Sequence, residues 1–349
     1  MHKREPGIDL IRCLGLLFVN GIHAFYFNGY YFQPQTTGVI LVADGFRWLF
    51  FCANGIFMML TGYLKTSQPL SKRYFHSLLP ILVSYAIASA ISIPIRHFYC
   101  NDAQSLEVWF SRFITFFGVN YGWYIEMYVG LLLFSPVLNL AMDALEKRKH
   151  GLLWLAGIMV FLTALPSATE LAVAPDYWTG LYPLTFYVIG AVIRRLQPNF
   201  KSWLCLLGAL LVSFGLGFVT WITTDEGASK GFGQGYGGFW VTVITTLLFL
   251  GLYRARPGKP VSRVLAWAAG GVFEGYMLSH LLDFWVYGEA KALQKPELYP
   301  LAFLCLTVPI FLISILSGKA LNTLTKTLIS LPSRKKSRHH VVEEHSPSA

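Results

Sequence analysis

The sequence predicts an all-helical protein that crosses a membrane many times. Three observations favour this fold class: 54% of the 349 residues are hydrophobic, only 13% are charged, and the apolar residues come in blocks. Soluble domains usually carry about 25% charged residues. Blocks of about twenty apolar residues are long enough to cross a ~30 Å hydrocarbon core as helices. The composition therefore excludes a soluble globular protein and a disordered one.

Each expected helix is an apolar block, and Lys and Arg gather between several of the blocks. The first block follows Lys3 and Arg4 and has no small-residue cleavage site after it, so we expect it to remain as a spanning helix rather than a removed signal peptide. About ten transmembrane helices are expected, near residues 8–28, 40–63, 74–96, 121–143, 151–168, 180–194, 202–222, 237–253, 264–287 and 298–319.

The distribution of charge predicts the orientation. With the N-terminus in the cytoplasm, most of the 28 Lys and Arg residues fall on the cytoplasmic side, so both termini are expected there. This topology and anionic lipid headgroups account for the net charge of +10, and no nucleic-acid partner is expected. We expect residues 1–330 to form the membrane-embedded domain and residues 331–349 a basic, disordered cytoplasmic tail.

No metal site is expected. The five cysteines form no CxxC pair, and no His cluster has metal-ligand spacing. The segment 97–120 is long for a connection and contains an apolar run, so an interfacial or re-entrant piece near an acceptor site is expected there.

Ionisable residues within apolar blocks are costly and mark candidate functional sites. Arg12 and His23 lie eleven residues apart in the first block, which on a helix is only ~20° from the same direction and roughly 16 Å along the axis. Asp9 can pair with Arg12. The guanidinium would bind phosphate at the inner mouth, and His23 could serve as a general base deeper in the membrane. Alternatively, Arg12 only anchors the helix at lipid headgroups and His23 only bridges two helices.

Two further carboxylates are expected within spans, Glu126 and Glu274. Either could orient His23 if its helix packs on the first one, and the sequence does not choose between them. Glu126 could instead be interfacial, Glu274 a structural partner, and His280 a packing residue.

Several segments together resemble one protein family. Asp9, Arg12 and His23 form an Asp-x-x-Arg-x10-His pattern, and the later segments 54–64, 122–136, 186–190 and 275–280 follow in the same order. This series resembles the acyltransferase 3 family of bacterial integral-membrane O-acyltransferases, with Thr61 where that family has Ser. Where the family has Arg-x-x-Arg, this chain has Lys72 and Arg73, with His76 in place of the second Arg.

The resemblance implies an inner-membrane (plasma-membrane) O-acetyltransferase of bacteria. Acetyl-CoA, or another cytoplasmic acyl-CoA, would be the donor, and a hydroxyl of an envelope carbohydrate or lipid-linked sugar the acceptor, with membrane lipids around the protein. His23 matches the family's catalytic histidine, and Arg12 its arginine; Asp9, Lys72 and Arg73 become candidates for the donor site. Lys72 and Arg73 could equally be ordinary cytoplasmic anchors.

The alternative is a multi-pass transporter or flippase for a lipid-linked sugar. Such proteins often have two related halves with interrupted helices at corresponding positions, a pairing not found in this sequence. We therefore expect the acyltransferase.

Overall fold

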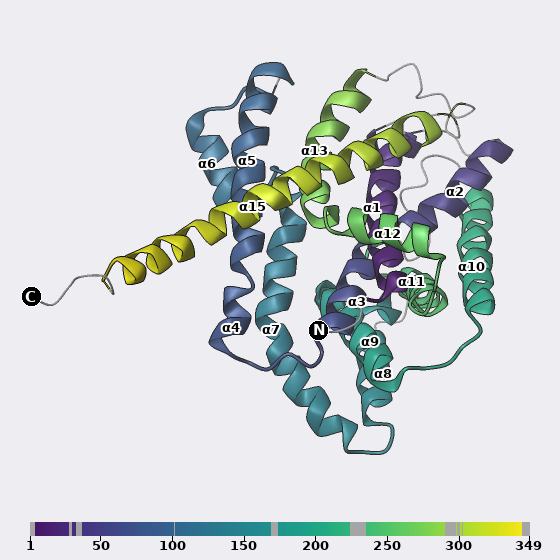
Figure 1. Ribbon diagram of the computed structural model, residues 1–349. Helices are drawn as coiled ribbons and strands as arrows, with labels where there is room; N and C mark the ends of the chain where they lie inside the picture. The colour runs from purple at the N-terminus through teal and green to yellow at the C-terminus, as the bar shows by residue number, and fades with distance from the viewer. Residues whose placement is uncertain are drawn as a thin grey trace, which may run out of the picture.

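In a computed structural model, every regular element among the described residues is helical, which confirms the predicted fold class (Figure 1). The structure describes residues 4–27, 30–32, 37–100, 102–168, 174–223, 235–289, 298, 301 and 303–343. Six helical stretches of this part are long and apolar enough to cross a membrane: Pro6–Phe27, Gly38–Lys65, Tyr74–Tyr99, Gly122–Glu146, Ser202–Thr223 and Cys305–Ser330. The chain is therefore a multi-pass membrane protein.

The helices follow one another through short connections. The first half of the chain forms α1 (Pro6–Phe27), α2 (Gly38–Phe50), α3 (Ala53–Lys65), α4 (Lys72–His76), α5 (Leu79–Tyr99), α6 (Leu106–Ile114) and α7 (Gly122–Glu146). The second half forms α8 (Gly151–Thr163), α9 (Tyr182–Leu196), α10 (Ser202–Thr223), α11 (Phe239–Leu252), α12 (Lys259–Ala269), α13 (Val272–Glu289), a π-helical turn (Phe303–Thr307) and α15 (Val308–Glu343).

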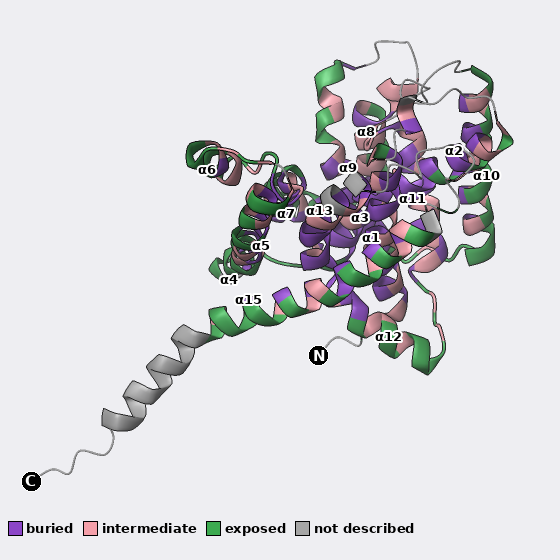
Figure 2. Ribbon diagram, turned by 90° about the horizontal axis from the view of Figure 1, so that it is seen from above, coloured by how far each residue is buried: buried purple, intermediate pink, exposed green. Residues whose placement is uncertain are grey.

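Helix α1 lies at the centre of the molecule and packs against α2, α3, α11, α12 and α13. Ile11, Leu16 and Val19 are buried in the core, and in Figure 2 the buried residues concentrate around α1, α3 and α9. Pro6 opens the helix at a position where its missing N–H costs nothing, and Asp9 in the first turn suits the positive end of the helix dipole. The predicted first span is thus the axis around which the other helices are arranged.

Several helices approach each other closely through glycines. A Cβ atom on Gly62 of α3 would overlap the carbonyl oxygen of Tyr187 on α9, and one on Gly190 of α9 would overlap that of Met59 on α3. Gly275 of α13 and Gly318 of α15 make a similar crossing. Small residues let backbones approach where the hydrophobic effect does not drive helices together.

Some expected helices are interrupted. The block 40–63 breaks at Phe51–Cys52 into α2 and α3, and the block 264–287 breaks at Gly270–Gly271 into α12 and α13. Segment 97–120 contains α6, as a short helix outside the six long stretches. Helix α15 leaves the body of the protein obliquely (Figure 1) and continues past residue 331, where the sequence predicts the tail to begin. That division of the chain stays a prediction.

Candidate active site

The His23 side chain is paired with a carboxylate from another helix, Asp283 of α13. Nδ1 of His23 lies 2.8 Å from Oδ2 of Asp283, and the Asp283 side chain is fully buried. An ionised carboxylate only accepts hydrogen bonds, so Nδ1 carries the hydrogen and Nε2 keeps its lone pair. A histidine oriented in this way is suited to act as a general base.

Two more side chains complete this group. The Tyr121 hydroxyl donates to the same Asp283 oxygen at 2.7 Å, and its ring stacks on the His23 ring with 4.1 Å between centroids. The edge of His280 meets the Tyr121 ring with 4.4 Å between centroids. The four residues come from α1, α13 and the residue that precedes α7. We call His23, Tyr121, His280 and Asp283 the histidine cluster.

A pocket of about 370 Å³ lies between α1, α3, α7, α13 and α15. Three cations from different helices line it, Arg12, Lys65 and Lys326, against one carboxylate, Glu274. The rest of its wall is mainly apolar and aromatic: Phe57, Leu60, Thr61, Leu64, Ile81, Tyr124, Tyr128, Ala269, Gly270, Val272, Phe273, Tyr276 and Asn322. We call it the arm pocket, because an anionic molecule with a long, largely uncharged arm would match this lining.

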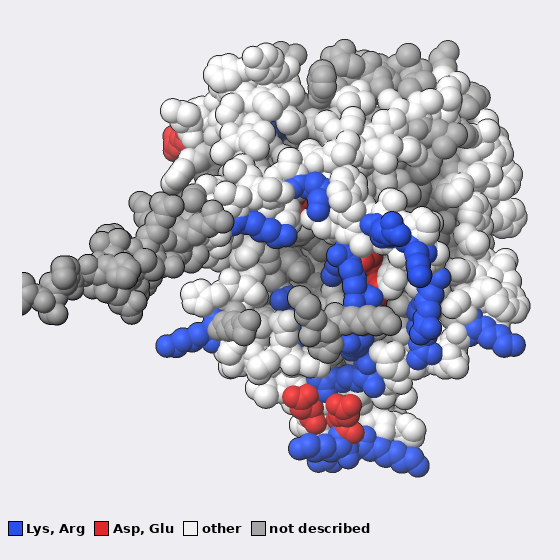
Figure 3. Space-filling model, in the orientation of Figure 1, with Lys and Arg blue, Asp and Glu red and all other residues white. Residues whose placement is uncertain are grey.

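A second pocket of about 530 Å³ shares Arg12 and Leu64 with the arm pocket. Arg4, Arg12 and Arg194 line it together with Glu5 and Asp9, so its charge is also positive on balance. We call it the head pocket. Figure 3 shows Lys and Arg side chains gathered around a hollow in the middle of one face of the molecule. Arg12 thus lies where the two pockets meet.

The carboxylate of Asp9 holds the arginines of this region. Asp9 is buried, and it accepts from Nε of Arg4 at 2.6 Å and from Nη1 of Arg12 at 3.4 Å. The hydrogen bond to Asp9 raises the pKa of the Arg4 guanidinium, which therefore stays charged. The expected contact between Asp9 and Arg12 is present, and Asp9 positions both arginines.

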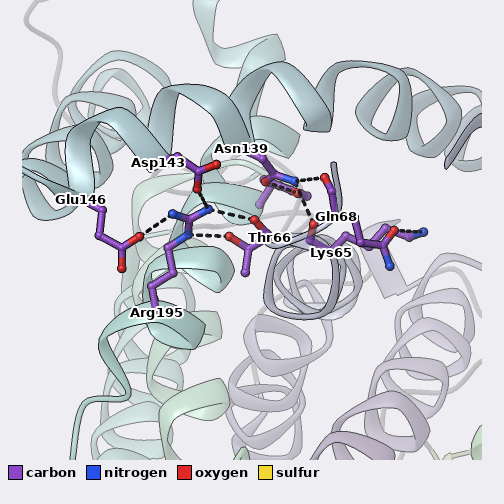
Figure 4. A network of polar contacts seen from close by, with 8 residues as sticks. Lys65, Thr66, Gln68, Asn139, Asp143, Glu146 and Arg195 are labelled. Carbon is purple, nitrogen blue, oxygen red and sulfur yellow. Dashed lines mark hydrogen bonds and ion pairs between the residues drawn. The ribbon is translucent and has the colours of Figure 1, made fainter. Parts of the chain in front are cut away.

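A polar network fixes the end of α3, from which Lys65 and Thr66 reach the pockets (Figure 4). Arg195 of α9 pairs with Asp143 and Glu146 of α7, both at 2.7 Å, and Nη2 donates to the carbonyl oxygen of Thr66 at 2.8 Å. Asn139 of α7 donates to the Lys65 carbonyl oxygen at 2.9 Å. These contacts tie α3, α7 and α9 together beside both pockets.

Tyrosines separate the arm pocket from the histidine cluster. Tyr124 and Tyr276 line the pocket, whereas His23 does not. The Tyr276 hydroxyl donates to the Tyr121 carbonyl oxygen at 3.3 Å, and the Tyr124 and Tyr276 ring centroids are 5.0 Å apart. We call Tyr121, Tyr124 and Tyr276 the tyrosine barrier, because they lie between the pocket and His23.

The other predicted site residues have different surroundings. Glu274 is buried in the wall of the arm pocket, where it accepts from Asn322 at 2.9 Å and Ser84 at 3.3 Å. Glu126 is exposed on α7, and neither glutamate is the carboxylate that contacts His23. Lys72 is exposed on α4 and lines neither pocket, while the side chain of Arg73 lies outside the described ones.

Sequence reasoning misses Asp283, although a signal was present. Asp283 is an ionisable residue within the expected helix 264–287, which by itself marks a candidate. It also follows His280 by three residues, so the two share one helix face. Tyr121 carried no comparable signal, because tyrosines at this level usually belong to the aromatic belt of the membrane interface.

Fold and site together define a multi-pass membrane protein in which a cationic pocket approaches a His–Asp pair. A family profile described as an acyltransferase domain matches residues 5–319. The chain belongs to the acyltransferase 3 family, and it is a membrane acyltransferase. No curated protein and no solved structure matches the chain.

Proposed function

We propose that this protein transfers an acetyl group from acetyl-CoA to a hydroxyl of an envelope carbohydrate or lipid-linked sugar, in the inner membrane of a bacterium. The observation that carries the proposal is the His23–Asp283 pair, which lies across the tyrosine barrier from a pocket with a cationic lining. The lining suits a donor with a phosphorylated head and a long uncharged arm, and coenzyme A has both.

The donor site extends over both pockets. The phosphates of the head contact Arg12, Arg4 and Arg194, since guanidinium groups match phosphate geometry. The pantetheine arm follows the arm pocket past Lys65 and the aromatic side chains toward Tyr276. The thioester meets His23 once the rings of the tyrosine barrier move apart. Lys72 and Arg73 remain candidates for a first contact with the phosphates from α4.

His23 acts as the general base in the transfer step. Nε2 takes the proton of the acceptor hydroxyl while the hydroxyl oxygen attacks the thioester carbonyl carbon. The carbon–sulfur bond then breaks, and the CoA sulfur leaves with the proton that His23 releases. Asp283 stabilises the positive charge of the imidazolium between these two events, because its carboxylate contacts Nδ1 at 2.8 Å. The products are an acetyl ester and free CoA.

The experiment compares envelope glycans of cells that lack the protein and of cells that produce wild-type or His23→Ala protein. Mass spectrometry should find an acetylated glycan with the wild-type protein only. His150→Asn is the matched control, because His150 is exposed in a turn with φ of 59°, which Asn tolerates. Acetylation at the wild-type level with His23→Ala would contradict the role of His23. Movement of a lipid-linked sugar without any acetylation would favour a transporter.

A further inference from the structure

The segment between α6 and α7 has an unusual backbone. Phe116, Asn120 and Tyr121 have φ values of 57°, 51° and 52°. This left-handed region is unfavourable for residues with a Cβ, and more so for a bulky side chain than for Asn. Residues held in such conformations cluster at functional sites, where the surrounding structure maintains them.

The neighbouring helices hold this segment in place. Arg96 of α5 donates to the Gly118 carbonyl oxygen at 2.5 Å, and Asn120 donates to Ser89 of α5 at 3.1 Å. A Cβ on Gly122 would overlap the Phe116 carbonyl oxygen, so the chain turns back on itself there. The unfavourable φ of Tyr121 is therefore imposed by contacts on both sides of it.

Helix capping does not explain a tyrosine at position 121. Tyr121 is the residue at the start of α7, yet its side chain forms no capping hydrogen bond. The side chain instead reaches away from its own helix, to His23 of α1 and Asp283 of α13. One residue thus contacts both members of the His–Asp pair, with the ring against the imidazole and the hydroxyl on the carboxylate.

We propose that Tyr121 is a positioning residue of the acyl transfer, which fixes the His23 ring and Asp283 so that Nε2 stays aimed at the acceptor hydroxyl. The inference rests on the proposed function. Oδ2 of Asp283 accepts from both His23 and Tyr121, while Oδ1 is buried without a hydrogen-bond partner among the described residues. Without the tyrosine hydroxyl, the carboxylate is free to turn and the pair loses its alignment.

The test uses purified protein with acetyl-CoA and isolated envelope glycans, and measures released CoA. Tyr121→Phe keeps the ring and removes the hydroxyl, so kcat should fall about tenfold to a hundredfold, the effect of losing one hydrogen bond to a charged group. KM and the dissociation constant for acetyl-CoA should not change, because Tyr121 does not line the arm pocket. Tyr121→Asn covers the case that the Phe variant does not fold, and its kcat should fall at least as far.

Tyr85→Phe is the matched control. It also removes a tyrosine hydroxyl that donates to a backbone carbonyl oxygen in this region, that of Phe113 at 3.1 Å, without touching the histidine cluster. Its kcat should equal that of the wild type. A double-mutant cycle with Asp283→Asn gives a second measure, since Tyr121→Phe should add little once the carboxylate is gone.

Two negative outcomes are distinguishable. Acetyl transfer by the wild type that Tyr121→Phe leaves unchanged, or a loss that adds fully to that of Asp283→Asn, overturns the positioning role and leaves the proposed function intact. An absence of acetyl transfer by the wild type overturns the proposed function, and this inference with it.

Discussion

At the scale of single residues, the charge on Asp283 decides what His23 can do. A buried histidine without a partner has no fixed tautomer, and a proton taken up by it would be an unpaired charge in an apolar place. Asp283 supplies both the acceptor for Nδ1 and the compensating charge. The carboxylate is therefore as important to the proposed chemistry as the imidazole.

Asp283→Asn should lower kcat by about two to four orders of magnitude, because the amide can donate to Nδ1 and leave the hydrogen on Nε2. Acetyl-CoA binding should be unchanged. Asp176→Asn is the control, since that carboxylate is exposed and far from His23 in the chain. Steady-state kinetics together with isothermal titration distinguish this result from a binding defect, and an unchanged kcat would argue against the pair.

Arg12→Ala should weaken acetyl-CoA binding by about tenfold to a hundredfold, since it removes a guanidinium shared by both pockets. Lys201→Ala is the control, because Lys201 is exposed and lines neither pocket. Titration of the purified protein with acetyl-CoA gives both dissociation constants. An affinity equal to the wild-type value would remove Arg12 from the donor site.

Helical periodicity predicts the part of the site that lies on one helix. Asp9 and Arg12 are in contact as expected, and Arg12 and His23 lie on one helix, α1. The partner of His23 was not predictable with the same certainty, because it depends on how α13 packs against α1. Likewise, Lys65 and Lys326 join Arg12 only because α3 and α15 meet α1 around one pocket.

At the scale of elements, the crossing of α3 and α9 supports both pockets. Gly62 and Gly190 let the two helices approach within reach of the network around Arg195. Hydropathy places both helices in the membrane, but it does not show which pairs cross closely. The interruptions at 51–52 and 270–271 escape prediction for a related reason, because the flanking blocks are continuously apolar.

Gly62→Ala should lower the free energy of unfolding by about 1–3 kcal/mol, since the added methyl group forces the backbones apart. Gly157→Ala is the control, because a Cβ on Gly157 would meet no atom within 4 Å. Thermal melting of the two variants in the same detergent checks the difference. Equal melting temperatures would show that the crossing tolerates separation.

At the scale of the whole molecule, the charge distribution predicts that both termini are cytoplasmic. In a protein whose five native cysteines are replaced by serine, Glu107→Cys should react with a membrane-impermeant maleimide on intact cells. Lys149→Cys should react only after the cells are permeabilised. Both positions are exposed, so burial does not confuse the comparison. The reverse labelling pattern would invert the topology, and with it the side from which acetyl-CoA enters.

The tyrosine barrier also has a consequence for the energy supply of the cell. A water-filled path from the cationic pocket to His23 would let protons cross the membrane and dissipate the proton gradient. Tyr121, Tyr124 and Tyr276 close that path with aromatic rings. Liposomes that contain Tyr276→Ala protein should therefore lose an imposed pH gradient faster than liposomes with wild-type protein. On this view, the same rings that must part for each acetyl group act as electrical insulation between one turnover and the next.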